Sequence, residues 1–288
     1  MGKLRLITFA TLLIASTSTI FANSTELLKN TLPQTAEAQT FDLYSRPLDR
    51  PEKSPFFLSG SLLMLAPQIA LFPTDTYEPG LRLSGGLNGS NWDAGFSYTY
   101  FGTSYRFDSE YVLKESPHKR LKIDSHFSFN DYESTLAIPY ALEGELLLHT
   151  LFGIEYATTE RYAQYTYKKE PLSEEAQLSK FSGLGPQLGL KLTKPLSNGL
   201  DLTGTLTQSL LKSRVYWVPE KFQQYSPVTK LHLGAEWSVG DDREKFFHLA
   251  AGYEFQYWGN EAFIDMGDYL ESQDLTLQGF GFEAKLNF

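Results

Sequence analysis

The chain has 288 residues, a formal net charge of −9 at pH 7 and no cysteine, so it can hold no disulfide, thiolate nucleophile or cysteine-ligated zinc site. A mean hydropathy of −0.28 argues against a bundle of membrane helices. The negative charge disfavours nucleic acid as a partner.

The first residues have the composition of a secretory signal peptide. Lys3 and Arg5 form a positive start, residues 6–15 are apolar, and Ala22 ends a cleavage sequence. The apolar stretch is too short to cross a bilayer as a helix, which takes about 20 residues. We therefore predict a signal peptide over residues 1–22.

The next segment, residues 23–55, is polar, contains proline and lacks a sustained period. We interpret it as a periplasmic extension of the mature protein. A plug that enters the lumen of a barrel is the alternative interpretation, and the sequence leaves both open.

From residue 56 to 288 the apolar residues recur with a period of two, which is typical of strands with one apolar and one polar face. The last strand is the clearest example, because apolar residues hold every even position from Phe280 to Phe288. Ten such segments follow one another: 57–66, 80–88, 92–101, 121–140, 145–157, 181–194, 200–213, 227–239, 246–258 and 275–288.

The connections between these segments alternate strictly in length. The short ones are 89–91, 141–144, 195–199 and 240–245, and the long ones are 67–79, 102–120, 158–180, 214–226 and 259–274. This alternation predicts an all-β fold, a transmembrane antiparallel up-and-down β-barrel of about ten strands, with short periplasmic turns and long extracellular loops. A soluble, aromatic-rich β-sandwich would show similar periodicity, but it has no reason to alternate so regularly.

Aromatic residues fall at both ends of the predicted strands, as in the two interfacial belts of a membrane barrel. The turn ends carry Trp92, Tyr140, Trp237, Phe247 and Phe288, and the loop ends carry Tyr98, Tyr100, Tyr156 and Tyr257. An aromatic last residue, Phe288, that closes an alternating strand is typical of the assembly signal of bacterial outer-membrane barrels. We therefore expect outer-membrane lipid and, through the C-terminal strand, the barrel-assembly machinery as partners, with a homo-oligomer left open.

Two segments interrupt the alternation. In the segment 121–140 the apolar positions change from odd to even near Asn130 and Asp131, which predicts a β-bulge. In the segment 181–194, Pro186 cannot donate to a ladder, which predicts a second bulge at Gly185-Pro186.

Several runs carry a resemblance to a known family. Residues 79–82 (PGLR) with Trp92-Asp93 and residues 98–101 (YTYF), residues 183–186 (GLGP) with Gly189, and residues 252–258 (GYEFQYW) are similar to hairpins of the Legionella major outer membrane protein-like family. The resemblance covers most of the chain from about Phe57. It implies an outer-membrane barrel with a broad pore-forming role, and no catalytic residue.

Because successive side chains on a strand face opposite sides, the charged residues between the lipid-facing ones are expected to face the barrel interior. We refer to this rule as parity. It predicts the following pore-lining residues: Arg82, Asp93, Lys191, Asp201, Lys230, His232, Glu236, His248, Glu254, Glu283 and Lys285. A barrel of ten strands lies near the size at which side chains fill the interior. A wide porin, a narrow or gated pore, and a structural barrel with a filled lumen are therefore all open.

One group of residues suggests an enzyme. Asp124, His126 and Ser128 lie on one face of the segment 121–140 and supply the acid, base and hydroxyl of acyl transfer. Positions i and i+2 on one strand are about 7 Å apart, too far for a direct proton relay. We favour a structural role, and we expect no enzyme, no cofactor and no metal site.

Together these patterns predict a multi-pass β-barrel in the outer membrane of a Gram-negative-type envelope. The predicted function is a narrow or gated pore for passive diffusion of small hydrophilic solutes or ions. The alternative is a non-conducting structural or adhesin-like barrel whose outer loops make surface contacts.

Overall fold

A computed structural model describes residues 55–69, 72–73, 76–89, 91–113, 116–142, 145–168, 175–196, 199–217, 220–239, 247–265 and 270–288, which belong to one compact unit, Ser45–Phe288. The predicted signal peptide and nearly all of the predicted extension lie outside these residues. In the described part of the chain, no helix is long and apolar enough to cross a membrane.

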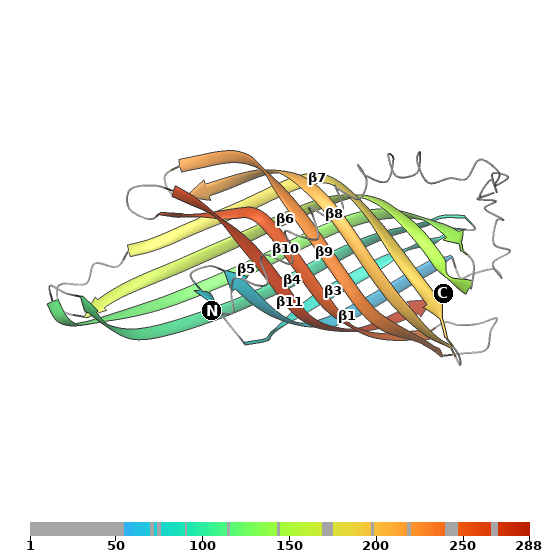
Figure 1. The fold of residues 1–288 in the computed structure, drawn as a ribbon, viewed down its shortest axis with the longest axis horizontal. Helices are drawn as coiled ribbons and strands as arrows, with labels where there is room; N and C mark the ends of the chain where they lie inside the picture. The colour runs from blue at the N-terminus through green and yellow to red at the C-terminus, as the bar shows by residue number, and fades with distance from the viewer. Residues whose placement is uncertain are drawn as a thin grey trace, which may run out of the picture. The chain divides into compact units, whose positions relative to one another are not determined.

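The described residues form one antiparallel sheet that closes on itself (Figure 1). Each strand of the barrel wall pairs with the next wall strand along the chain, and β1 also pairs with β11. Ten strands form the wall, and the two-residue β2 (Phe72–Pro73) folds back on β1. The wall strands are β1 (Phe56–Ile69), β3 (Glu78–Asn88), β4 (Asp93–Leu113), β5 (Ser116–Ala141), β6 (Leu147–Lys168), β7 (Glu175–Pro195), β8 (Leu200–Trp217), β9 (Glu220–Val239), β10 (Phe247–Asp265) and β11 (Leu270–Asn287).

The closing seam joins the first strand to the last. Phe56 and Phe288 exchange both backbone hydrogen bonds, at 3.1 and 3.0 Å, and their rings stack with centroids 6.3 Å apart. The register then continues without a shift from Phe57 opposite Asn287 to Ile69 opposite Leu275. The predicted up-and-down barrel of ten strands is therefore confirmed.

The strands extend beyond their predicted ends. Four of the five segments predicted as long outer loops continue as paired strand, so that β4 runs to Leu113 and β5 begins at Ser116. In Figure 1 the hairpins of β4 with β5 and of β6 with β7 reach furthest from the end at which the chain terminates. Outside a membrane neither face of a strand has to be apolar, so charged residues such as those of β4 beyond Phe101 led these segments to be interpreted as loops.

The outer face of the wall is apolar where the strands alternate. Leu62, Phe96, Ile154 and Leu188, on four different strands, each leave about half of the side chain exposed in the isolated chain. The rings of Tyr98, Tyr132 and Tyr156 lie in a row across β4, β5 and β6, tilted to one another with centroids 4.8 and 5.9 Å apart. A surface with an apolar band and a tyrosine row at its rim suits a lipid bilayer.

Neither of the two predicted bulges is present. The register of β4 with β5 is constant from Asp93 opposite Ala137 to Tyr111 opposite Lys119, so the chain passes Asn130 and Asp131 without an extra residue. The register of β7 with β8 is also the same on either side of Pro186, where only the ladder pairs of Gly185 and Pro186 are missing. The change of phase near Asn130 has a different cause, because Phe127 and Phe129 face the interior and are buried.

At the end of the barrel opposite the short turns, neighbouring strands stop pairing at different levels. Pairing of β3 with β4 ends at Gly80 opposite Phe101, and pairing of β9 with β10 ends at Val228 opposite Trp258. A register shift between Trp258 and Ala262 separates the upper part of β10 from β9. Side chains bridge this split, because Gln224 and Ser226 donate hydrogen bonds to the carbonyl oxygen of Asn260.

Candidate functional site

The interior of the barrel is the candidate site, and its residues lie in tiers along the axis. The tier nearest the short turns is a polar cavity of about 240 Å³. Seven of the eleven residues predicted to line the lumen surround this cavity: Arg82, Lys191, His232, Glu236, His248, Glu283 and Lys285. The remaining four lie elsewhere, with Lys230 and Glu254 in the tier above and Asp93 and Asp201 partly buried at the starts of their strands.

Three interior glycines lie close to His232, which is one of the residues that line this cavity. Gly252 of β10 is paired with Gly234 of β9 and with Gly281 of β11. A Cβ atom on Gly252 would lie 2.7 Å from Nε2 of His232, and one on Gly234 would lie 3.1 Å from the same ring. The imidazole of His232 therefore occupies space that any larger residue at these positions would fill.

Ionic side chains cross the lumen above the cavity. The guanidinium of Arg82 on β3 donates two hydrogen bonds to Glu254 on β10, at 2.9 and 2.6 Å, and a third to Thr99. A bidentate pair of this kind is geometrically specific and strong. The pair ties β3 to β10, which are three strands apart around the barrel.

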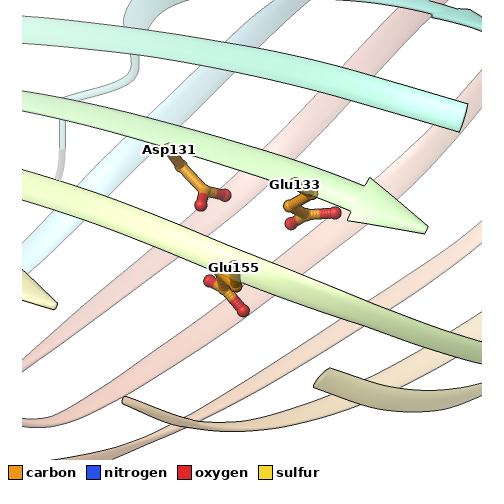
Figure 2. A group of neighbouring side chains, drawn as sticks. All are labelled: Asp131, Glu133 and Glu155. Carbon is orange, nitrogen blue, oxygen red and sulfur yellow. The ribbon is translucent and has the colours of Figure 1, made fainter. Parts of the chain in front are cut away.

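A second ionic group joins β9 to β5 and β6. The ammonium of Lys230 contacts the carboxylates of Asp131, Glu133 and Glu155, the last at 2.8 Å. Figure 2 shows the three carboxylates directed toward a common space from two neighbouring strands. Their oxygens lie within 4.8 Å of one another, which is the arrangement of a cation site, but here Lys230 supplies the cation. One ammonium faces three carboxylates, and the buried Oδ1 of Asp131 has no hydrogen-bond partner among the described residues.

The next tier is apolar and fills the cross-section of the barrel. Nine of the ten wall strands contribute to it, and its side chains are at most 5% exposed. Its members are Leu63, Leu65, Phe101, Phe127, Phe129, Ala157, Phe181, Leu211, Val215, Val228, Trp258, Leu275 and Leu277, which we call the apolar layer. Phe129 meets Trp258 edge-on at 5.1 Å, and the ammonium of Lys230 lies 5.1 Å from the Trp258 ring. Buried apolar side chains from nine strands thus meet in one cluster across the barrel interior.

The interior tier furthest from the short turns is again polar. Arg161 and Thr159 of β6 both bind the buried carboxylate of Glu261 on β10. The guanidinium of Arg161 also lies 5.6 Å from the ring of Phe127, so it covers the outer surface of the apolar layer. Charged groups therefore bound the apolar layer on both sides.

The three residues that suggested an enzyme lie outside the barrel interior. Asp124 accepts a hydrogen bond of 2.7 Å from Arg106, and His126 is 2.7 Å from the hydroxyl of Ser104. The hydrogen bond that Arg106 donates to Asp124 raises the pKa of Arg106 above its ordinary value. The acid and the base are thus both bound to β4, as expected for residues that stabilise a projecting hairpin.

Sequence reasoning missed two sets of interior residues. Asp131, Glu133 and Glu155 were not among the predicted lumen residues, although Glu155 stands between the outward Ile154 and Tyr156. The apolar layer was missed because its residues are apolar, and parity alone assigns apolar side chains to the lipid. The position of Phe101 could have revealed this layer, because Tyr100 faces outward and the next side chain on a strand faces the opposite way.

Comparison with known proteins agrees with this geometry. Residues 73–288 match the family described as Legionella pneumophila major outer membrane protein precursor, and no protein with a curated description matches the chain. Among solved structures, the outer membrane protease OmpT from Escherichia coli is similar with a TM-score of 0.57 and 11% identity, over 83% of this chain and 97% of that one. A major outer membrane protein from Thermus thermophilus is also similar, with a TM-score of 0.33 and 14% identity over 81% of this chain and 98% of that one. At 11% identity the OmpT structure shows the barrel fold alone.

Proposed function

Since the chain belongs to the Legionella pneumophila major outer membrane protein family and is an outer-membrane β-barrel, we propose that it is a closed barrel that presents its extracellular end for surface contact. The observation that carries this proposal is the apolar layer, which spans the lumen with side chains that are almost fully buried. Ions and hydrophilic solutes would have to cross this layer without polar partners, which is costly.

The ionic tier supports the same proposal. Arg82 with Glu254, and Lys230 with three carboxylates, hold distant walls together beneath the apolar layer. Opening a path would require both groups to separate, and each would leave buried charges unpaired. The long hairpins of β4 with β5 and of β6 with β7 extend from the other end of the barrel, which is the end that we propose for contact with other molecules.

A narrow or gated pore is the second candidate, as the sequence predicted. The polar cavity of about 240 Å³, with its mixed charges, favours it, because a solute could enter there if the apolar layer moved. We assign no catalytic role to the chain in either case.

Conductance separates the two candidates. The refolded full chain is reconstituted in a planar lipid bilayer, and we expect no current steps. A double variant, Phe129→Gly with Trp258→Gly, hollows the apolar layer at its centre and is expected to produce steps. Phe96→Gly, which removes a lipid-facing ring, is the control and should stay silent. Regular steps from the unmodified protein would overturn the closed barrel and establish the pore.

A further inference from the structure

Four cations gather on the outer face of β7, β8 and β9, above the apolar band. We call Lys180, Lys212, Arg214 and Lys221 the basic patch. Lys212, Arg214 and Lys221 are exposed, and 45% of the Lys180 side chain is accessible. In a chain with a formal net charge of −9, such a concentration of positive charge on one surface is unusual.

The strand register places the four cations close together. Lys212 and Arg214 are two residues apart on β8 and therefore share one face. Lys180 of β7 is opposite Tyr216, and Lys221 of β9 is opposite the same tyrosine. Lys180 and Lys221 are therefore two strand spacings apart, about 10 Å, with Arg214 on the strand between them, which is within reach of one multivalent anion.

The partners of these cations within the chain are weak. Lys180 forms an exposed ion pair of 2.8 Å with Glu160, and Lys221 lies 5.3 Å from the ring of Tyr216. Exposed ion pairs of this type contribute little, because water screens them. The patch is therefore available to an external anion.

The position of the patch identifies that anion. Lys212 is opposite Leu184 in the ladder and two residues from Leu210, and both leucines face lipid with about half of their surface exposed. The cations therefore lie directly beyond the lipid-facing leucines, at the edge of the hydrocarbon region of the membrane. The short turns, the start of β1 and the end of β11 lie at the other end of the strands, which places the patch on the extracellular side, level with the headgroups of the outer leaflet.

We propose that the basic patch binds the phosphate groups of a phosphorylated lipid in the outer leaflet, while the acyl chains of that lipid lie against Leu184, Leu210 and their neighbours. Lys and Arg are the residues that bind phosphate in proteins, and the fork of Arg214 can hold two phosphate oxygens. The apolar wall and the cations together recognise a molecule with an acyl part and an anionic head.

Binding is measured with the refolded full chain in phosphatidylcholine nanodiscs, titrated with diphosphorylated lipid A and with the same lipid after removal of both phosphates. A triple variant, Lys212→Gln, Arg214→Gln and Lys221→Gln, should weaken binding of the phosphorylated lipid on the order of 100-fold, since each interfacial cation contributes about fivefold. The unmodified chain should prefer the phosphorylated lipid by a comparable factor.

A matched pair of single variants controls for charge. Arg214→Gln removes one cation from the patch, and Lys194→Gln removes one exposed cation from β7 at the opposite end of the barrel. Only the first should weaken binding, by about fivefold. The proposal is overturned if the triple variant binds within twofold of the unmodified chain, if both lipids bind equally, or if millimolar inorganic phosphate displaces the lipid completely.

Discussion

Replacing Lys230 with methionine tests the ionic tier most directly. The substitution keeps the length of the side chain but removes the ammonium that contacts Asp131, Glu133 and Glu155. Three carboxylates would then remain within 4.8 Å of one another, two of them with at most 1% of the side chain exposed. Removing one partner of a buried ionic group costs about 3–5 kcal/mol, which is a large part of the stability of a typical domain.

The free energy of unfolding is measured by urea titration of the protein in lipid vesicles, followed by tryptophan fluorescence. Trp258 lies 5.1 Å from Lys230 and reports the change locally. Lys194→Met, at an exposed position on β7, is the control and should be close to neutral. Acidification protonates the carboxylates and removes their repulsion, so the loss caused by Lys230→Met should shrink as the pH falls. A loss below about 1 kcal/mol at neutral pH would refute the reasoning, because unpaired buried carboxylates cannot be that cheap.

Three further predictions follow from the wall and the cavity. Leu188→Arg should cost about 2–4 kcal/mol of unfolding free energy in vesicles and Leu188→Ala much less, and equal losses would contradict a lipid-facing wall. Gly252→Val should lower the free energy of unfolding by about 1–3 kcal/mol, because the new side chain would overpack against His232, whereas Gly204→Val on the outer face should be tolerated. A larger loss for Gly204→Val than for Gly252→Val would contradict this placement of His232. Unmodified protein should release no fatty acid from a lipid ester, and hydrolysis that is lost in His126→Ala would assign catalysis to the projecting hairpin.

The sequence predicted the barrel because one face of each strand must suit lipid. Alternation such as that around Phe280 and Phe282 is repeated ten times, and the turn lengths between the segments are equally regular. The same reasoning did not predict the parts of the strands that extend beyond the bilayer on the extracellular side. The charged residues Arg106, Asp108 and Glu110 led residues 102–113 of β4 to be interpreted as a loop, although the aromatic residues between them follow the period of a strand.

The interior was predicted only in part, for a physical reason. Parity identified the charged cavity residues, since polar side chains rarely face lipid. It could not identify Phe127 and Phe129 as interior residues, because apolar side chains are stable in either place, and their odd positions were interpreted as the result of a bulge at Asn130. The contact of Lys230 with Asp131 joins residues 99 positions apart in the chain, and no local pattern encodes it.

The seam between β1 and β11 bears on the order in which the molecule assembles. Phe57 finds its partner in Asn287, near the other end of the chain, so this ladder has the highest contact order in the protein. Until β11 arrives, β1 and β10 each keep an open edge, and such edges invite pairing with other chains. Closure must therefore be a late event in folding, and a chain interrupted before Leu270 would be prone to aggregate instead of inserting as a monomer.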